Sequence, residues 1–454
     1  MSFQAPPGRP GNLTAEQEEK LRKLWAAIFH LTGVADEESS GAELLSPKEE
    51  ASPAEADTKK KRGFGMFKKA KSGTSTPTEA STDEDKYGET KQFHETLAKE
   101  SPESIRHTIW SMVKHDHPDA LVLRFLRARK WDVEKALVML VSTMNWRHND
   151  MKVDDDIMKN GDAVAIEEEK KTDAPNHQVS ADMMKQLRMG KSFLHGTDKQ
   201  GRPICVVRVR LHKAGSECEE SLEKYTVYII ETARMTLQPP VDTACIVFDM
   251  TGFSMANMDY TPVKFMIKCF EANYPESLGA VLVHKAPWLF QGIWKVIRGW
   301  LDPVVAAKVH FTNNRAELEE FIAPDHLIKE LDGDENWEYK YVEPVPGENE
   351  KMKDTQTRDR LLAEREELVK KYEHATREWI RHSEGEQGKQ IKTERESIAK
   401  LLREGYWNLD QYIRARTLYD RQGAIHSGGT TDWYSLKPPA AGATASSTSA
   451  DDLD

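Results

Sequence analysis

The chain has 454 residues, of which 64 are Lys or Arg and 75 are Asp or Glu, so its formal net charge at pH 7 is −11. Hydrophobic residues make up 38% and charged residues 31%, which indicates one sizeable folded region with polar extensions rather than a wholly globular chain. Four widely spaced cysteines and the lack of any run near about 18 uncharged apolar residues exclude a disulfide scaffold and an integral membrane protein, and the acidic balance argues against bulk nucleic-acid binding.

The first predicted element is a helix near the start of the chain. Thr14 and Gln17 have the spacing of a capping box, apolar residues follow at helical intervals, and Gly33 suits the helix end. From Asp36 to about Tyr87 the composition turns to Ser, Thr, Pro, Glu and Lys. Such a segment cannot bury enough apolar surface to offset its ordering entropy, so we expect disorder there.

A basic patch at residues 59–71 lies inside this polar segment. It carries seven positive charges and no acidic residue, with Phe64, Met66 and Phe67 interleaved. In a disordered segment the patch would dock on anionic lipid at about 1 kcal/mol per basic residue. A nuclear import signal and a solubilising linker fit the same residues, so its role stays open.

Helical periodicity returns at residues 93–146. The stretch 136–146 is the last predicted helix of this region, and Asp132 is placed to cap it. Residues 151–178 are acidic and weakly patterned, which predicts a loop.

Short apolar runs mark a different pattern after residue 200. The runs at 204–207, 244–249 and 280–283 are typical of strands, and the last two have almost no polar alternation, as in strands covered on both faces. Helical patterns fill the intervals between them, which implies a largely parallel sheet with crossover helices. After Tyr341 the chain is charged and helix-prone to about Gly423, and a small-residue tail follows.

No motif for covalent catalysis or metal binding is evident. Residues 196–201 have the glycine spacing of a phosphate loop, but Arg202 follows where a lysine is needed, so a tight turn between strands is predicted. His115 and His117 have no third ligand nearby and indicate a polar helix end. The sequence thus predicts no enzyme, no catalytic residue, no metal and no cofactor other than a bound ligand.

Residues 287–301 form an unusual apolar segment. On a helix, their apolar side chains would cover most of the circumference, so a second face must meet a core, a lipid cavity or a bilayer interface. A fully buried helix is the alternative. Gly292 and Gly299 each cost roughly 1 kcal/mol in a helix interior and favour a mobile element, and Asp302 can cap a short helix that follows.

Several of these motifs, in this order, resemble the CRAL-TRIO lipid-binding family, and specifically its phosphatidylinositol transfer branch. The stretch 123–132 resembles the signature of the helical amino-terminal lobe. Blocks similar to those of the lipid-binding domain lie at 198–203, 244–249, 273–276, 286–287 and 301–303, with Lys308 following. The resemblance covers residues 93–345, over half of the chain.

The resemblance implies an α/β fold with an all-helical amino-terminal lobe and a lipid-binding domain, in which a largely parallel sheet floors an apolar cavity closed by a gate helix at 288–300. The predicted organisation is an amino-terminal helix at 1–35, a disordered linker with the basic patch at 36–90, the helical lobe at 91–150, the lipid-binding domain at 151–345, a charged helical extension at 346–425 and a disordered tail at 426–454.

The resemblance also implies a set of site residues. It places Arg129, Glu276, Asp302 and Lys308 at an inositol phosphate headgroup, Ala244, Ile246 and Phe248 along the cavity, and Trp288, Phe290, Trp294 and Trp300 on the gate and at the membrane. For the four charged residues, an ordinary ion-pair network that braces two lobes is the alternative.

Two departures from the family pattern affect the expected ligand. Val305 stands where phosphatidylinositol binders commonly place a threonine that contacts the phosphate. Ala244 and Ile246 stand where phosphatidylcholine exchangers place hydroxyl groups, so we expect weak or no phosphatidylcholine binding and room for a sterol or another neutral lipid.

The resulting hypothesis is a cytoplasmic, non-enzymatic protein that carries one phospholipid, phosphatidylinositol first, and associates peripherally with intracellular membranes. Its expected partners are the lipid and the membrane surface, with no nucleic acid. The alternatives are a sterol or neutral-lipid carrier, and a membrane-associated scaffold or regulator whose helices at 350–423 recruit a protein partner.

Overall fold

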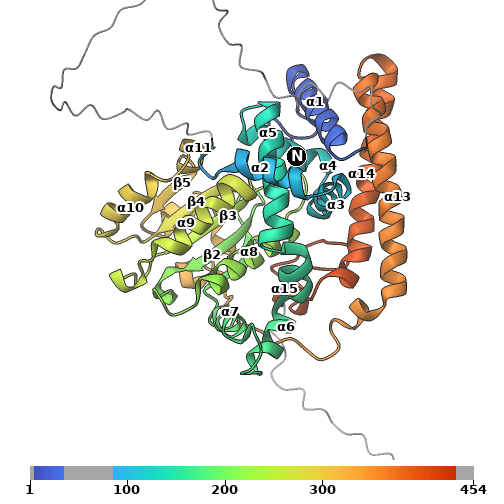
Figure 1. Ribbon diagram of the computed structural model, residues 1–454. Coiled ribbons are helices and arrows are strands. Elements are labelled where there is room, and N and C mark those ends of the chain that lie inside the picture. Colours follow the sequence, from blue (N-terminus) through green and yellow to red (C-terminus); the bar gives the residue numbers. More distant parts are fainter. Residues whose placement is uncertain (1–4, 35–84, 436–454) are drawn as a thin grey trace, which may run out of the picture.

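The computed structural model describes residues 5–34 and 85–435 of the chain. The basic patch at 59–71 and residues 436–454 lie outside the described residues. A sheet with its covering helices forms one side of the molecule, and a pair of long helices forms the other (Figure 1). The fold is an α/β domain joined to a helical part, which confirms the predicted fold class.

Five helices build the amino-terminal part of the helical region. They are α1 (Ala15–Leu31), α2 (Glu89–Lys99), α3 (Pro102–Val113), α4 (Pro118–Ala128) and α5 (Val133–Asn145). Local signals set their ends: Thr14 and Gln17 form the predicted capping box, and the Asp132 carboxylate accepts a 3.0 Å hydrogen bond from a backbone N–H of α5. All five helices contribute side chains to one apolar core.

Two long helices, α13 (Thr355–Arg381) and α14 (Gly385–Ile413), complete this helical part. They run side by side along the edge of the molecule opposite the sheet (Figure 1). Their buried anchor is polar as well as apolar, because the Asp119 carboxylate accepts hydrogen bonds from the Trp25 indole at 2.7 Å, the Tyr372 hydroxyl at 2.9 Å and the Arg395 guanidinium at 2.6 Å. The charged helices therefore close on α1 and α4 rather than extending freely.

The sheet has five strands in the order β1-β2-β3-β4-β5. They are β1 (Ser192–Thr197), β2 (Pro203–Arg208), β3 (Ala244–Asp249), β4 (Leu278–His284) and β5 (Val309–Thr312). Only β1 is antiparallel to its neighbour, and the other pairs are parallel, as predicted. The glycine pair at 196–201 is the predicted turn between β1 and β2, where Gly201 adopts φ +75°, a conformation that suits glycine.

Crossover helices lie on one face of the sheet. α8 (Glu219–Met235) and α9 (Tyr260–Lys268) cover β2, β3 and β4 in the view of Figure 1, and α10 (Phe290–Arg298) lies beside them. The opposite face carries Val206, Val247 and Leu282, which share an apolar cluster with Leu318 of α12 (Arg315–Leu318). β3 and β4 are thus buried on both faces, as their nearly continuous apolar sequences predict.

Residues 151–178 differ from the loop that their sequence predicts. The structure contains α6 (Lys159–Glu169) there, preceded by a π-helical turn (Val153–Met158) and followed by α7 (His177–Met189). One acidic residue of this stretch, Asp162, has buried partners: its carboxylate accepts a hydrogen bond from the Tyr341 hydroxyl at 2.8 Å and pairs with Arg421 of α15 (Leu418–Arg421). These long-range partners stabilise a helix that local composition disfavours.

The predicted tail from residue 426 is ordered in its first part. Residues 426–435 form turns, Thr431 makes an isolated bridge with Ile425, and the Trp433 indole is buried. The Tyr434 hydroxyl accepts a 2.9 Å hydrogen bond from the backbone N–H of Thr197. Aromatic anchors thus fix a stretch that its small polar residues marked as unstructured.

None of the helices in the described ranges is long and apolar enough to cross a membrane.

Candidate functional site

A cavity of about 220 Å³ lies between the sheet and the helices α8, α9 and α10. Most of its lining is apolar and comes from all four of these elements. The apolar lining residues on the sheet are Val207, Ile246, Phe248, Leu278, Val281, Val283 and Val309. Those on the helices include Leu222, Val263, Met266, Ile267, Phe290, Trp294 and Ile297. The interior therefore contains an apolar space that the side chains of the protein do not fill.

The sheet forms the floor of this cavity through the two-residue period of its strands. Ile246 and Phe248 point into the cavity from β3, and Val281 and Val283 do so from β4. Ala244, at the start of β3, is half-buried and is not among the residues that line the cavity. Of the three residues predicted to line the cavity, Ile246 and Phe248 do so and Ala244 does not.

The helix α10 forms the lid of the cavity, but it is shorter than the 288–300 segment predicted for a gate. Its inner face consists of Phe290, Ile293 and Ile297, which are buried, while Lys295 and Arg298 are exposed on the outer face. The helix is amphipathic and not apolar all round, because its cationic residues fall on one side. The cavity is thus closed by an apolar face whose reverse side meets solvent.

The aromatic residues predicted for the gate lie in different places. Trp288 precedes α10 and is 87% exposed, whereas Phe290 is buried with its ring 5.8 Å from that of Phe253. Trp294 lines the cavity and packs on Phe311, and Trp300 lies beyond the end of the helix against Tyr260. In this closed arrangement only Trp288 presents its ring fully to the outside.

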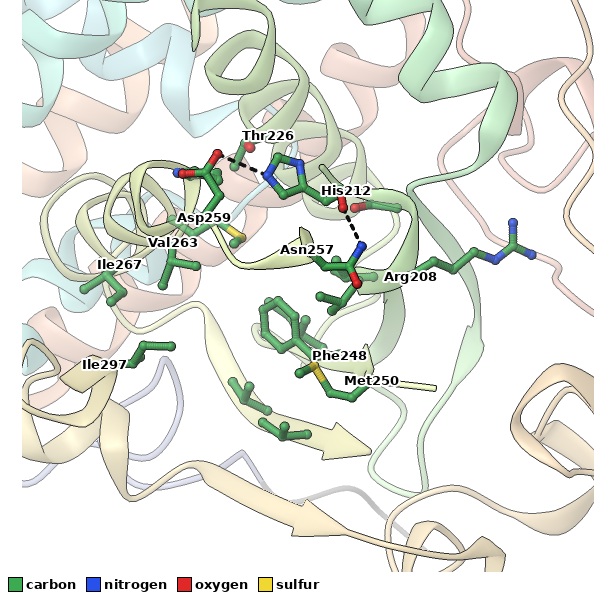
Figure 2. A pocket seen from close by; sticks show the side chains of 18 of the residues that line it. Arg208, His212, Thr226, Phe248, Met250, Asn257, Asp259, Val263, Ile267 and Ile297 are labelled. Carbon is green, nitrogen blue, oxygen red and sulfur yellow. Dashed lines mark hydrogen bonds and ion pairs between the residues drawn. The ribbon is translucent and has the colours of Figure 1, made fainter. Parts of the chain in front are cut away.

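Polar residues gather on one side of the cavity (Figure 2). His212 and Asp259 face each other there with Nε2 and Oδ2 3.2 Å apart, and Asn257 donates a 2.8 Å hydrogen bond to the backbone carbonyl of His212. The Lys191 ammonium lies 2.7 Å from the Glu217 carboxylate. Burial lowers the pKa of both Lys191 and His212. The sequence offers no motif for this cluster, since its members are spread from residue 191 to residue 259 and most lie in the connections between helices and strands.

Lys308 and Glu276 lie together at the end of the sheet where β5 and β4 begin, as the resemblance implies. Their Nζ and Oε2 atoms are 3.7 Å apart, and both side chains are 22% exposed. The backbone carbonyl of Glu276 accepts a 2.8 Å hydrogen bond from Arg124 of α4. This partly open ion pair therefore sits where the helical part meets the sheet.

Arg129 lies at the end of α4 and pairs with a different carboxylate. Its guanidinium donates hydrogen bonds of 2.7 and 2.6 Å to the two oxygens of Glu89, at the start of α2. Burial raises the pKa of Glu89 even with this cation beside it. The structure thus divides the four predicted headgroup residues between separate contacts, with Arg129 held by Glu89 and Lys308 held by Glu276.

Asp302, the fourth of these residues, has a local role that its sequence predicts. Its carboxylate accepts a 2.7 Å hydrogen bond from the Val304 N–H and so caps the short helix α11 (Pro303–Ala306). Its own backbone N–H donates a 2.7 Å hydrogen bond to Glu271. Glu271 also binds Lys86 and Tyr87, three residues that no motif marks.

The histidine pair at 115 and 117 holds no metal-binding geometry. The His115 ring is buried and lies 5.0 Å from the Trp407 ring, while the His117 Nδ1 atom accepts a 3.0 Å hydrogen bond from the Asp119 N–H at the start of α4. Over the ranges 5–34 and 85–435, no three His, Cys, Asp or Glu side chains come together as metal ligands.

Two protein-family models match parts of this chain. A model of the CRAL/TRIO domain matches residues 187–333, and a model of the CRAL/TRIO N-terminal domain matches residues 89–142. The first range contains the whole sheet with α8, α9 and α10, and the second contains α2, α3, α4 and most of α5.

Curated relatives match nearly the full length of the chain. The CRAL-TRIO domain-containing protein C3H8.02 of Schizosaccharomyces pombe is 42% identical over 425 residues, which cover 92% of each chain. The phosphatidylinositol transfer protein CSR1 of Eremothecium gossypii is 38% identical over 449 residues, which cover 94% of this chain and 100% of the relative. A second Schizosaccharomyces pombe protein, the CRAL-TRIO domain-containing protein C365.01, is 27% identical over 73% of this chain and 90% of its own length.

Proposed function

The chain belongs to the CRAL/TRIO domain family, and from this premise we propose that it is a carrier that holds one phospholipid, phosphatidylinositol first, under α10 and exchanges it at membranes. The observation that carries the proposal is the apolar cavity between the sheet and α10. A relative of almost the same length is named a phosphatidylinositol transfer protein, which supports this choice of lipid.

The cavity supplies what a lipid tail needs outside a bilayer. Two acyl chains hold on the order of 30 methylenes at about 0.8 kcal/mol each, or roughly 25 kcal/mol if they were exposed to water. The floor made by Ile246, Phe248, Val281 and Val283 and the inner face of α10 offer apolar surface in its place. A bound lipid would part α10 from the floor and keep both surfaces covered.

The amphipathic character of α10 suits opening at a membrane. When α10 swings outward, Phe290, Ile293 and Ile297 lose their contacts with the floor and would face water. At a bilayer the same side chains enter the interface, so the cost of exposing them falls. Trp288 is already exposed and suits the interfacial region, and Lys295 on the outer face would meet anionic lipid headgroups. These features support peripheral association with membranes.

For the headgroup phosphate we propose two cations, Lys308 beside the sheet and Arg129 at the end of α4. In our proposal, Lys308 and Arg129 bind the phosphate, and Asp302 stabilises the adjoining turn. Glu276 and Glu89 are within reach of these two cations when no lipid is present. Such carboxylate partners keep partly buried cations from being left unpaired when the phosphate leaves.

Selectivity against phosphatidylcholine follows from the apolar floor. Ile246 lines the cavity and provides no hydroxyl group for a phosphate held deeper inside. A phosphate buried there without donors loses its hydration without compensation, so we propose weak or no phosphatidylcholine binding. The same apolar floor would accept a sterol or another neutral lipid as an alternative ligand.

The carrier needs no catalytic chemistry. Its proposed steps are binding, enclosure and release of an unchanged lipid, and each rests on apolar contact or ion pairing. In the scaffold alternative, α13 and α14 would recruit a protein partner. Their buried residues Tyr372, Trp379 and Leu402 already pack on the chain's own helices, so that role would have to use their exposed faces.

Lipid loading tests the proposal directly. The purified full chain is mixed with vesicles of phosphatidylcholine, phosphatidylserine and phosphatidylinositol and is then separated from them. Native mass spectrometry measures the mass of the protein with any lipid bound to it. We expect a one-to-one complex with phosphatidylinositol, and a transfer of labelled phosphatidylinositol between donor and acceptor vesicles. A chain that binds the vesicles but extracts no phospholipid would be a scaffold and not a carrier.

The headgroup role has its own variant. Lys308→Ala should lower phosphatidylinositol transfer by roughly tenfold, since a hydrogen bond to a charged group is lost, while the melting temperature stays the same. Lys353→Ala, which removes an exposed pair with Glu350, is the matched control. Retained phosphatidylinositol transfer by Lys308→Ala at unchanged stability would remove the headgroup role from this lysine.

A further inference from the structure

A short strap at residues 85–88 crosses the end of the gate. It leads directly into α2, and its side chains reach across to the segment after α9 and to the segment after α10. The Lys86 ammonium lies 2.8 Å from Oε2 of Glu271, and the Tyr87 hydroxyl donates a 2.7 Å hydrogen bond to the same oxygen. The strap is therefore tied to a single carboxylate by two side chains.

The same carboxylate also binds the segment 299–302 that follows α10, which we call the exit of the gate. Oε1 of Glu271 accepts a 2.7 Å hydrogen bond from the backbone N–H of Asp302, four residues after α10 ends. Lys86 also donates directly to the backbone carbonyl of Trp300. Glu271 thus joins the strap on one oxygen and the exit of the gate on the other, and Lys86 makes a second link between the same two segments.

These contacts act on the backbone of the only connection between α10 and α11. Trp300 and Leu301 form the turn that links the two helices, with the Trp300 N–H bonded to Ile297 at 2.9 Å. An outward movement of α10 that displaces its carboxy-terminal end must also move the Trp300 carbonyl or the Asp302 N–H. Lys86 and Glu271 hold these two groups, so the swing has to break or carry along the strap.

The burial of Glu271 gives the contacts their strength. Its side chain is 7% exposed, whereas that of Lys86 is 36% exposed. A buried carboxylate is costly unless it accepts hydrogen bonds, and here the Lys86 ammonium, the Tyr87 hydroxyl and the Asp302 N–H donate to it. The carboxylate also raises the pKa of Tyr87, after the larger effect of burial, so the hydroxyl keeps its proton and stays a donor.

We propose that Lys86, Tyr87 and Glu271 form a latch that fastens the exit of the gate and positions Asp302. This inference rests on the proposed function, because it assigns α10 the role of a gate. The latch makes opening slower than the apolar contacts of α10 alone would allow. It also places the proposed headgroup residue Asp302 through its backbone, without either Lys86 or Glu271 having to contact the lipid tails.

Hydrogen exchange of the full-length, lipid-free chain tests the latch without relying on transfer. In Lys86→Met/Tyr87→Phe, amides of residues 290–302 should exchange roughly 3- to 10-fold faster than in the wild type, since hydrogen bonds to a charged group are lost. Amides of α13 and α14 should exchange at the wild-type rate. Unchanged exchange at 290–302, with the variant folded, would overturn the latch.

Two further variants guard against misfolding and nonspecific charge effects. Lys392→Met removes a long-range pair with Glu18, with Nζ and Oε1 2.7 Å apart and 40% exposure of the lysine, between α14 and α1. It should leave exchange at 290–302 unchanged, and a rise equal to that of the latch variant would count against a specific role. Lys86→Met alone replaces the double variant if the latter does not fold, and it should show a smaller increase at the same amides.

Transfer kinetics form the second arm of the test. With labelled phosphatidylinositol, the latch variant should release lipid to acceptor vesicles severalfold faster, while equilibrium loading falls by a smaller factor. Equal changes in release and loading would indicate a lost binding residue and would overturn the latch. If the wild-type chain loads no phospholipid at all, the proposed function fails, whereas the exchange experiment still decides whether the strap restrains α10.

Discussion

The Arg147 guanidinium donates a 2.6 Å hydrogen bond to Glu231, and neither side chain reaches solvent. Arg147 follows α5 of the helical part, whereas Glu231 lies on α8 beside the sheet. Glu231 also accepts hydrogen bonds of 2.8 Å from the Lys114 ammonium and the Tyr274 hydroxyl. Against the cost of burial, these cations hold the pKa of Glu231 well below its usual range. The Glu231 carboxylate therefore links α8, beside the sheet, to the helical part of the molecule through buried hydrogen bonds.

Replacing this carboxylate should strongly destabilise the chain. In Glu231→Gln, the side chains of Arg147 and Lys114 keep their buried positions and their pairs with Asp154, but lose the second of their two countercharges. We therefore expect a loss of about 3 kcal/mol in the free energy of unfolding. Urea unfolding monitored by circular dichroism measures it. Glu167→Gln, at an exposed pair with Lys170, is the control and should behave as the wild type. A loss no larger than in this control would show that the interface does not depend on the buried charges.

The stability of the chain should depend on the protonation of His115. Burial lowers the pKa of His115 to about 4, although the neighbouring Asp116 acts in the opposite direction. In the unfolded chain a histidine takes up a proton near pH 6.5, so between about pH 6.5 and 4 the unfolded state binds more protons. The folded state therefore loses stability as the pH falls through this window, by about 1.4 kcal/mol per pH unit and about 3 kcal/mol in all.

The variant His115→Phe isolates this contribution. Phenylalanine can keep the contact with Trp407 but has no proton to bind, so the stability of the variant relative to the wild type should rise by about 3 kcal/mol between pH 7 and pH 4. Urea unfolding at several pH values provides the two curves. His212 and His284, whose pKa values burial also lowers, are present in both proteins and cancel in the difference. Parallel curves would contradict the prediction.

The parts of the fold that the sequence predicted are those with local causes. The capping residues Thr14, Asp132 and Asp302 act on N–H groups within three residues, so their helices could be located from the sequence. The strands at 244–249 and 280–283 could be found for a similar reason, because burial on both faces leaves a continuous apolar run.

The parts that the sequence missed depend on distant partners. Asp162 belongs to an acidic stretch, and its helix is stabilised by Arg421, which lies 259 positions away in the sequence. Lys86 and Tyr87 have the composition of the polar linker, yet Lys86 binds Glu271 at a separation of 185 positions. No local pattern reports such contacts, so the ordered strap and its hydrogen bonds to Glu271 became visible only in the structure.

The two aromatic residues at the start of the gate should separate membrane binding from stability. Trp288 is 87% exposed, so Trp288→Ala should leave the melting temperature unchanged and weaken binding to anionic vesicles by roughly tenfold. Phe290 is buried against Phe253, so Phe290→Ala should instead lower the free energy of unfolding by about 3 kcal/mol. Vesicle flotation and thermal unfolding of both variants give the comparison. Vesicle binding by Trp288→Ala equal to that of the wild type would remove this residue from the membrane contact.

The ligand preference should respond to a single hydroxyl group at Val305. This side chain is half-buried and lines the cavity next to α10, whereas its neighbour Val304 is 49% exposed. In Val305→Thr, an added hydroxyl can donate a hydrogen bond to the phosphate of a bound phosphatidylinositol, and we expect about 2- to 10-fold tighter binding, the range that one hydrogen bond supplies. Val304→Thr adds the same group outside the cavity and should bind as the wild type does. Titration with labelled phosphatidylinositol measures both, and equal affinities for Val305→Thr and the wild type would mean that the phosphate lies out of reach of α11.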